Sequence, residues 1–264
     1  MYQAFLARTL EAASEIARRN FGKVTGATKA GDNNQVLTET DLEIGAYIVG
    51  QMREQFPGHN VIDEEAGVVD NASDYTWVVD PIDGTSNFAA GVPTYAIMIG
   101  LLHGGVPVAG GIALPEQNEI YVAEKGSGAT RNEERIAVSK EGELSRTLVA
   151  YGIDGHQEAP EKTHSEMALL ERLILNIRNL RSSNSAFDMI MVARGGYGGF
   201  LNRTSKIWDN VAPHIIIEEA GGVYTDFFGE QMDYSDVLRR ADENFTCCAA
   251  PAKLHARLQA LIHS

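Results

Sequence analysis

The chain has 264 residues, 44% of them hydrophobic, and a formal net charge of −14 at pH 7. This length and apolar content suffice for a real hydrophobic core, so the chain should fold unaided. The acidic excess argues against a nucleic-acid partner, because sequence-independent binding depends on basic side chains, and an acidic protein that handles phosphate would instead recruit metal cations.

Apolar residues recur at helical spacing over the first twenty positions, which predicts an amphipathic helix that ends near Gly22. Glu11 and Glu15 interrupt its apolar run, unlike a signal peptide, and no run of about 18 apolar residues could span a membrane. We therefore expect a cytoplasmic protein without membrane contacts. A second helix follows, with Thr40 and Glu43 as a capping box and a stop at 56–58. Its apolar stripe comprises Leu42, Ile44, Ile48 and Met52.

Short apolar runs between turn signals come next and predict strands. These runs occupy 75–79, 95–102, 106–114 and 119–124. Gly104-Gly105 and the segment 115–118 have the composition of hairpin turns, so the strands are expected to form an antiparallel meander. The first half of the chain is therefore predicted to be α+β.

The second half mixes helices with strands after a polar stretch at 152–164. The pattern predicts helices over 165–176, 185–194, 209–220 and 252–263, and strands over 197–201, 222–225 and 245–249. The last strand holds Cys247 and Cys248, which as neighbours make a poor disulfide and are expected as buried, reduced thiols. Without a linker or repeat, we expect one domain over 1–264, with halves of about 1–145 and 146–264.

The most informative segment is 77–88, where a buried apolar strand is predicted to end at Asp80. Pro81 should then force a turn, and Asp83 follows three residues after Asp80, so two carboxylates converge on one spot. Gly84-Thr85-Ser86 would start a helix whose N–H groups and dipole favour an anion such as phosphate. Taken alone, the motif is as consistent with two aspartates that only cap a turn.

Two further acidic segments favour a metal site over capped turns. Asp63-Glu64-Glu65 directly follows the apolar pair Val61-Ile62, and one acidic strand end beside another is a good site for a hard cation. An acidic triplet on its own usually just faces solvent. Trp208-Asp209 stands where a helix would begin, so the default role of Asp209 is an N-cap. Gly221-Gly222 ends that helix.

Together these segments resemble the inositol monophosphatase family, the lithium-sensitive, magnesium-dependent phosphatases. The matching segments follow the expected order over nearly the whole chain: 37–41, Glu64-Glu65, 80–85, 120–129, Trp208-Asp209 and 219–222. The resemblance implies an α+β fold, a layered αβαβα sandwich of the sugar-phosphatase type, with a homodimer as the common assembly. It also implies Mg²⁺-dependent hydrolysis of a small phosphate monoester.

The resemblance implies a role for each matching position. Asp41 and Thr85 would form a hydrogen-bonded pair that, with Glu64 and one metal, orients and activates the attacking water. The metal ligands would be four carboxylates and one backbone carbonyl, namely Glu64, Asp80, Asp83, Asp209 and Ile82. Such oxygen ligands suit Mg²⁺, and paired metals stabilise the entering and leaving oxygens. No Ser, Cys or His nucleophile is then needed.

The substrate side matches the family less well. Phosphate would accept N–H bonds from Gly84 and Thr85 beside Asp83 and Asp209, and the alcohol would lie near Ser183-Asn184-Ser185. In inositol-specific members a Glu lies seven residues before the Trp-Asp aspartate, where this chain has Asn202. Inositol 1-phosphate or a related polyol phosphate ranks first, ahead of histidinol phosphate, fructose 1,6-bisphosphate and 3'-phosphoadenosine 5'-phosphate.

Two observations leave the alternatives open. Arg203 and Lys206 lie near Asn202 in the sequence, so a second phosphate or a nucleotide phosphate would find cations there. A catalytically silent regulatory or RNA-polymerase-associated member could keep the fold for protein contacts, although it should have lost some ligands, and every expected carboxylate is present. An acidic domain with capped turns only would scatter these carboxylates across the structure.

Overall fold

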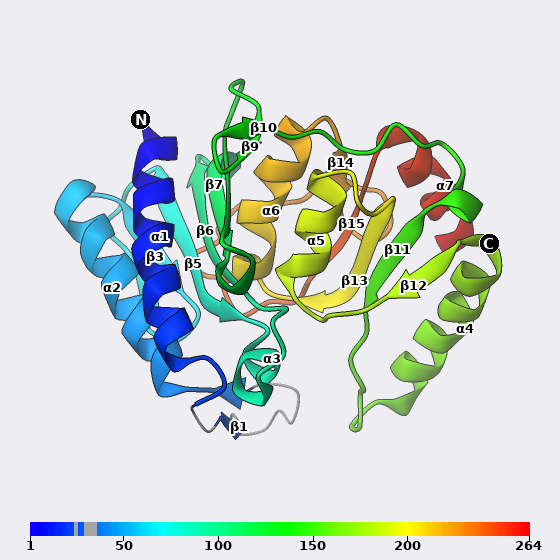
Figure 1. Cartoon of the computed structure of the whole chain (residues 1–264), viewed down its shortest axis with the longest axis horizontal. Helices are drawn as coiled ribbons and strands as arrows, with labels where there is room; N and C mark the ends of the chain where they lie inside the picture. Colours follow the sequence, from blue (N-terminus) through cyan, green and yellow to red (C-terminus); the bar gives the residue numbers. More distant parts are fainter. Residues whose placement is uncertain (24–25, 29–35) are drawn as a thin grey trace.

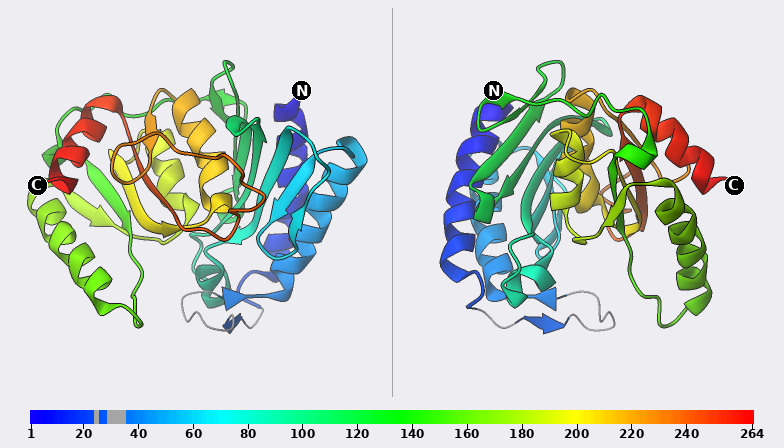
Figure 2. Two further views of the ribbon diagram at one scale, coloured as in Figure 1. Left: turned by 180° about the vertical axis from the view of Figure 1, so that it is seen from behind. Right: turned by 45° about the vertical axis from the view of Figure 1, so that its right-hand side comes forward.

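The computed structural model describes residues 1–23, 26–28 and 36–264, in which helices and sheets alternate in layers (Figure 1). Helices α1 and α2 cover one face of a large sheet, α5 and α6 lie between this sheet and a smaller one, and α4 and α7 cover the far side (Figure 2). This arrangement confirms the predicted α+β class and αβαβα order. The helices are α1 (Tyr2–Asn20), α2 (Glu39–Gln55), α3 (Thr85–Ala90), α4 (Pro160–Asn176), α5 (Ala186–Ala193), α6 (Ile207–Glu219) and α7 (Ala252–Ile262).

The large sheet has eight strands, and neighbouring strands within it pair antiparallel except for the parallel pair β3 and β5. Its spatial order is β10 (Glu134–Arg135), β9 (Ala129–Arg131), β8 (Glu119–Glu124), β7 (Val106–Leu114), β6 (Ala96–His103), β5 (Tyr75–Asp83), β3 (Asn60–Asp63) and β4 (Gly67–Val69). The strands β5 to β8 form the predicted antiparallel meander, and β7 and β8 have the predicted bounds.

The small sheet has five strands, of which β11 runs parallel to both of its neighbours, β12 and β13. Its spatial order is β12 (Asn179–Arg181), β11 (Leu148–Gly152), β13 (Gly199–Ser205), β15 (Phe245–Ala250) and β14 (Val223–Thr225). The carboxyl ends of β11, β12 and β13 therefore meet at one edge. A separate antiparallel pair joins β1 (Ala27–Thr28) to β2 (Val36–Leu37).

Helix α6 is buried almost all round, which is typical of a helix enclosed between two layers. It packs against β5 to β8 on one side and against β14 and β15 on the other. Its approach to the large sheet depends on a cross-strand pair of glycines, Gly100 on β6 and Gly110 on β7. A Cβ atom at Gly100 would lie 2.6 Å from Val211 Cγ1, and one at Gly110 would lie 2.8 Å from the carbonyl oxygen of Ala212. Only glycine leaves room for the helix there.

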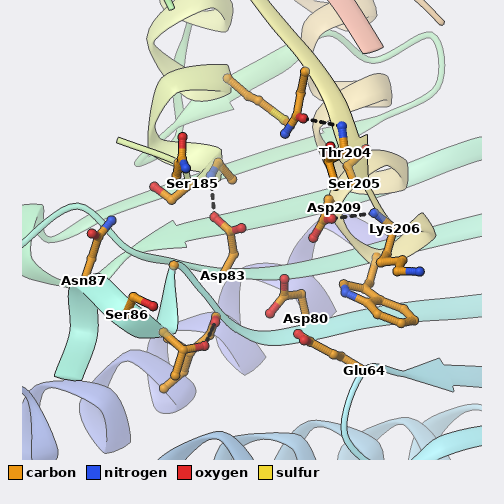
Figure 3. A pocket seen from close by; sticks show the side chains of 18 of the residues that line it. Glu64, Asp80, Asp83, Ser86, Asn87, Ser185, Thr204, Ser205, Lys206 and Asp209 are labelled. Carbon is orange, nitrogen blue, oxygen red and sulfur yellow. Dashed lines mark hydrogen bonds between the residues drawn. The ribbon is translucent and has the colours of Figure 1, made fainter. Parts of the chain in front are cut away.

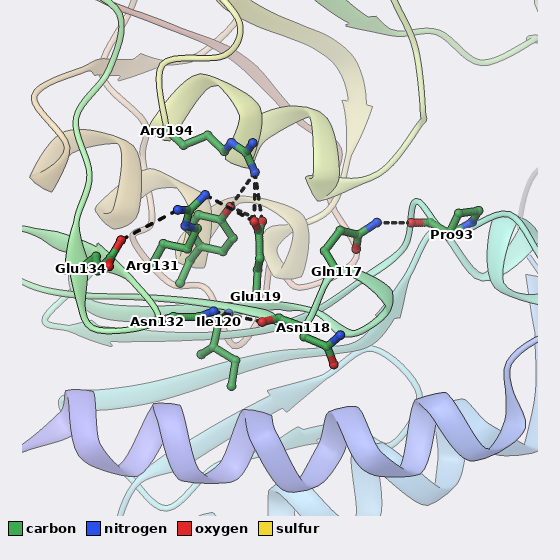
Figure 4. Close-up of polar contacts among 10 residues, drawn as sticks. Pro93, Gln117, Asn118, Glu119, Ile120, Arg131, Asn132, Glu134 and Arg194 are labelled. Carbon is green, nitrogen blue, oxygen red and sulfur yellow. Dashed lines mark hydrogen bonds and ion pairs between the residues drawn. The ribbon is translucent and has the colours of Figure 1, made fainter.

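A polar contact also ties the large sheet to the middle helix layer (Figure 4). The carboxylate of Glu119 on β8 accepts hydrogen bonds from Arg194 Nη1 at 3.0 and 3.2 Å and from Arg131 Nη1 at 3.4 Å. Arg194 follows the last turn of α5, so this ion pair joins the two halves of the chain on the side of the large sheet away from β4.

Two predicted boundaries were wrong near the acidic segments. Strand β5 continues through Pro81 to Asp83, with a register irregularity between Asp80 and Asp83, so Pro81 does not force a turn. A bulge needs no N–H from the proline, which is why the strand tolerates it. Helix α6 begins at Ile207, which makes Asp209 its third residue and not its N-cap.

The predicted cap of α2 was also wrong. The capping box is formed by Thr38 and Asp41, two residues earlier than the Thr40 and Glu43 pair expected from sequence. Leu42 is 51% exposed and so lies outside the apolar stripe, whereas Ile44, Ile48 and Met52 are buried. The helix ends at Gln55, as predicted.

In the second half the sequence pattern missed β11 and β12, and α4 begins five residues earlier than predicted, at Pro160. Cys247 and Cys248 are free and buried in β15, as expected, and burial raises the pKa of Cys247 to about 12. None of the described helices combines the length and apolar character that a membrane span requires.

The glycine pair under α6 gives a stability prediction. Replacing Gly110 with Ala should lower the free energy of unfolding by about 1–3 kcal/mol, because the new methyl group meets the backbone of Ala212. Gly50→Ala is the matched control, since Gly50 lies on the exposed face of α2 with nothing within 4 Å of an added Cβ. This control should be neutral or stabilising by up to about 1 kcal/mol. Urea unfolding measures both, and equal effects would contradict the packing argument.

Candidate active site

A pocket of about 460 Å³ opens where the carboxyl ends of the parallel strands of both sheets meet the first turn of α6. The large sheet contributes the end of β5, the residue that follows β3 and the start of α3. The small sheet contributes the end of β13 and the segments that follow β11 and β12. Ligands commonly bind outside the carboxyl ends of strands, so this position favours a functional site.

Three carboxylates converge at the floor of this pocket (Figure 3). Asp80 and Asp83 come from the last residues of β5, and Asp209 comes from the first turn of α6. One oxygen atom of each lies within 4.8 Å of the others. Glu64, directly after β3, lines the same pocket beside Asp80 but is outside this group of three. The carboxylates are therefore gathered and not scattered.

Backbone N–H groups from the second half of the chain hold two of these carboxylates in place. Asp83 Oδ2 accepts a short hydrogen bond from the N–H of Ala186, the first residue of α5. Asp209 Oδ2 accepts from the N–H of Lys206 at 2.6 Å. Asp80 differs, because its Oδ1 atom is buried and has no hydrogen-bond partner among the described residues. A buried carboxylate oxygen without a donor is a position for a cation.

The electrostatics of the site point the same way. Burial raises the pKa of Asp80 well above its ordinary value, and the charges of Glu64 and Asp83 raise it further. Burial and the charge of Asp209 likewise raise the pKa of Asp83. Burial raises the pKa of Asp209 to about 6, and the charge of Asp154 adds a smaller contribution. Hydrogen bonds from Lys206 and with Asp80 lower the pKa of Asp209 in part. Asp80 and Asp83, by contrast, feel the negative charge of their neighbours, and an oxygen-only donor set fits a hard divalent cation that would relieve this repulsion.

Asp41 and Thr85 form the hydrogen-bonded pair that the sequence led us to expect. Thr85 Oγ1 lies 3.2 Å from Asp41 Oδ1 and 2.8 Å from the carbonyl oxygen of Ile82. The other oxygen of Asp41 accepts from the N–H of Thr38 at 2.8 Å and from its hydroxyl at 2.5 Å. Burial raises the pKa of Asp41 although these bonds lower it. Thr85 lines the pocket, whereas Asp41 lies behind it.

Hydrogen bonds across the two halves build the neighbouring wall. Asn87 Nδ2 donates to the carbonyl oxygens of Thr94 and Ser183, each at 2.8 Å, and Ser185 Oγ donates to Thr94 at 2.9 Å. Of the expected substrate residues, Asn184 and Ser185 line the pocket, whereas Ser183 lies behind it with its N–H bonded to Asp188. The expected substrate residues Gly84 and Asn202 also line the pocket.

Asp154, Thr204 and Ser205 line the pocket but were not expected from sequence, and Lys206, expected near Asn202, also lines it. Asp154 stands two residues after β11, in the stretch taken as polar and weakly patterned. The signal that could have found it is the short apolar run Leu148–Gly152, because an acidic residue after a buried strand is what singled out Glu64 and Asp80.

Comparison with known proteins identifies the family. The inositol monophosphatase family model matches residues 2–264. A Neisseria meningitidis serogroup B protein named putative Nus factor SuhB is 35% identical over 209 residues, which cover 78% of this chain and 79% of that protein. An Aquifex aeolicus protein named fructose-1,6-bisphosphatase/inositol-1-monophosphatase is 32% identical over 234 residues, or 86% of each.

Solved structures agree with the sequence comparison. The structure of an IMPase from Thermotoga maritima superposes with a TM-score of 0.87 and 28% identity, and the match covers 98% of this chain and 96% of that one. The sequence match and the layered fold both extend over nearly the whole chain. The chain therefore belongs to the inositol monophosphatase family.

Proposed function

We propose that this chain is a Mg²⁺-dependent phosphatase that hydrolyses a small phosphate monoester to an alcohol and orthophosphate. The observation that carries the proposal is the convergence of Asp80, Asp83 and Asp209 at the floor of an open pocket. Membership of the inositol monophosphatase family supports the same chemistry. Inositol 1-phosphate or a related polyol phosphate is the proposed substrate, and the Aquifex aeolicus relative carries a name that includes this activity.

The residues proposed to hold Mg²⁺ are all oxygen donors: Asp80, Asp83, Asp209, Glu64 and the carbonyl of Ile82. When bound, Mg²⁺ supplies positive charge that lowers the pKa of water and offsets the negative charge of the phosphate. The carboxylates would hold the ion at the junction of the two sheets. The N–H groups of Gly84 and Thr85 are proposed to bind the phosphate oxygens at the start of α3.

Thr85 is proposed to orient the attacking water. Its hydroxyl has one proton, which it can donate to Asp41 or to Ile82, so its oxygen can accept a hydrogen bond from water in the pocket. Asp41 is held from behind by Thr38 and keeps the hydroxyl in one orientation. Glu64, beside Asp80, is the proposed acceptor for the proton of the water.

We also propose a single domain over 1–264, a cytoplasmic location and a homodimer. Light scattering tests the assembly, with twice the mass of the chain as the expected result. The absence of a nucleic-acid partner stays a prediction. The name of one relative, putative Nus factor SuhB, does not support it.

A second candidate function is a non-catalytic regulatory module with the same fold. The name putative Nus factor SuhB, carried by a relative that is 35% identical, favours it. The full set of carboxylates and the Asp41–Thr85 pair favour catalysis instead. Calorimetric titration with Mg²⁺ in the presence of phosphate separates the two, because a silent module that has lost its metal should show no binding heat.

Removal of one carboxylate tests the phosphatase directly. Asp80→Asn should abolish phosphate release from a panel of phosphate monoesters while the protein stays folded, because the amide replaces a proposed metal ligand. Mg²⁺ should raise the melting temperature of the wild type, and this rise should be lost in the variant. Asp74→Asn is the control, since exposed Asp74 lies just before the opposite end of β5. Full activity of Asp80→Asn would disprove the proposed site.

The raised carboxyl pKa values predict how stability depends on pH without metal. A folded protein that binds more protons than its unfolded chain loses stability as pH rises. For Asp209 this loss of stability falls between its ordinary pKa near 4 and its raised pKa of about 6. With a chelator present to remove metal, the free energy of unfolding should therefore drop more between pH 4.5 and 6.5 in the wild type than in Asp209→Asn. Urea unfolding at both pH values measures the difference, and parallel changes would contradict it.

The Thr85 hydroxyl gives a third prediction. Thr85→Val should lower kcat by about 10²–10⁴-fold, a range typical for loss of acid–base assistance, while KM changes little. Thr85→Ser retains the hydroxyl and should keep most of the activity. Steady-state kinetics on both variants, with circular dichroism as a check on folding, decides the role. Comparable kcat values for Val and Ser would show that the hydroxyl is not needed.

A further inference from the structure

A second, smaller pocket of about 150 Å³ lies beside the later turns of α6. It is bounded by the start of β7, the residue after β8 and the segment 231–234. His214 and Glu218 of α6 line it, and because an α-helix rises about 1.5 Å per residue, Glu218 lies about 14 Å along the axis from Asp209. No described residue lines both pockets. The second pocket is therefore separate from the proposed active site.

Two side chains of α6 place a nitrogen and an oxygen atom side by side at this pocket. His214 Nε2 lies 3.3 Å from Glu218 Oε1, and the two residues are four positions apart on the helix, so their side chains share one face. A tetrahedral Zn²⁺ ion with ligands at about 2.0–2.1 Å separates two ligand atoms by about 3.3–3.4 Å. The two atoms thus have the spacing of a pair of zinc ligands.

The ring of His214 is held in the orientation that a metal ligand needs. It is buried and stacks on the ring of Tyr224, with a centroid distance of 4.7 Å and an interplanar angle of 15°. Its Nδ1 atom lies 3.0 Å from the hydroxyl oxygen of Tyr234. Histidines that bind metals through one ring nitrogen almost always use the other in a hydrogen bond that fixes the tautomer and the ring orientation. The hydroxyl of Tyr234 occupies the position of that partner.

The charges at this pocket are mixed. The hydrogen bond with His214 and the charge of Lys125 lower the pKa of Glu218, although burial raises it, so the carboxylate is ionised at neutral pH. The side chain of Glu218 is 50% exposed, which leaves the carboxylate open to an ion from solvent. Lys125 also lines the pocket and opposes a cation, but its exposed position and flexible stem let the ammonium group turn into solvent.

From this geometry we propose that His214 and Glu218 form a second metal site, which takes a transition-metal ion such as Zn²⁺. An imidazole nitrogen suits Zn²⁺, whereas the oxygen-only floor of the larger pocket suits Mg²⁺. Water and the side chain of Gln231, which lines the same pocket, are available for the remaining coordination positions. An ion held across one turn of α6 would stabilise the helix that carries Asp209. The inference goes beyond the phosphatase function and does not depend on it.

Nuclear magnetic resonance of the histidine ring nitrogens tests the site directly. One equivalent of Zn²⁺, added to the protein in excess Mg²⁺, should shift the Nε2 resonance of His214, which is identified by its absence in His214→Gln. No histidine is among the described residues that line the larger pocket, so Zn²⁺ bound to the aspartates there would leave the ring nitrogens unmoved. An unchanged His214 resonance would overturn the proposal.

Calorimetric titration with Zn²⁺ in excess Mg²⁺ then measures what each group contributes. Glu218→Gln, at a half-exposed position that should not disturb folding, should lower the affinity at least about tenfold, and Tyr234→Phe should lower it by about 10–100-fold. Lys125→Met should raise the affinity by about two- to fivefold, since it removes a like charge at the surface. His164→Gln is the matched control, because it removes an exposed histidine from α4, and it should bind Zn²⁺ like the wild type.

These variants also separate the two-ligand site from simpler explanations. If Glu218→Gln binds Zn²⁺ as tightly as the wild type, the carboxylate is no ligand and the proposed site is wrong. If His164→Gln lowers the affinity as much as Glu218→Gln does, the ion binds exposed histidines without preference, which also refutes the site. Circular dichroism of each variant checks that the fold is retained.

Discussion

Mutual repulsion of Asp80, Asp83 and Asp209 is the constraint around which the rest of the structure is arranged. Like charges held within 4.8 Å of one another would separate in a flexible chain. Here each is held by a rigid element, two by the last residues of β5 and one by the first turn of α6. The N–H groups of Ala186 and Lys206 offset part of the charge, and a divalent cation would offset most of the remainder.

Because these anchors come from both halves of the chain, the pocket has two ends of different origin. The large sheet supplies Asp80, Asp83 and the start of α3, so the proposed metal and phosphate end depends on the irregular carboxyl end of β5. The small sheet supplies Asp154, Asn184 and the end of β13. Substitutions in the second group could therefore change the alcohol that is accepted without disturbing the first group, as expected for function carried by loops on a rigid scaffold.

The sequence predicted the acidic floor of the pocket far better than the wall formed by the small sheet. Asp80 and Asp83 follow the strand predicted at 75–79 and are only three residues apart, so one strand assignment was enough to place them together. Asp154 depends on the parallel pairing of β11 with β13, whose partners are about fifty residues apart in the chain. The short strand β11 gives no alternating pattern, since residues 149–152 are all buried, and it therefore passed as loop.

Helix α6 shows why the packing of the core and the chemistry of the pocket cannot be separated. The glycine pair on β6 and β7 lets the helix sit against the large sheet, and the same helix carries Asp209 towards Asp80. A side chain at either glycine would push α6 away from the sheet and would move Asp209 with it. Since a misplacement of about 1 Å can cost roughly a hundredfold in rate, two glycines that touch no substrate help to set the distance between the carboxylates.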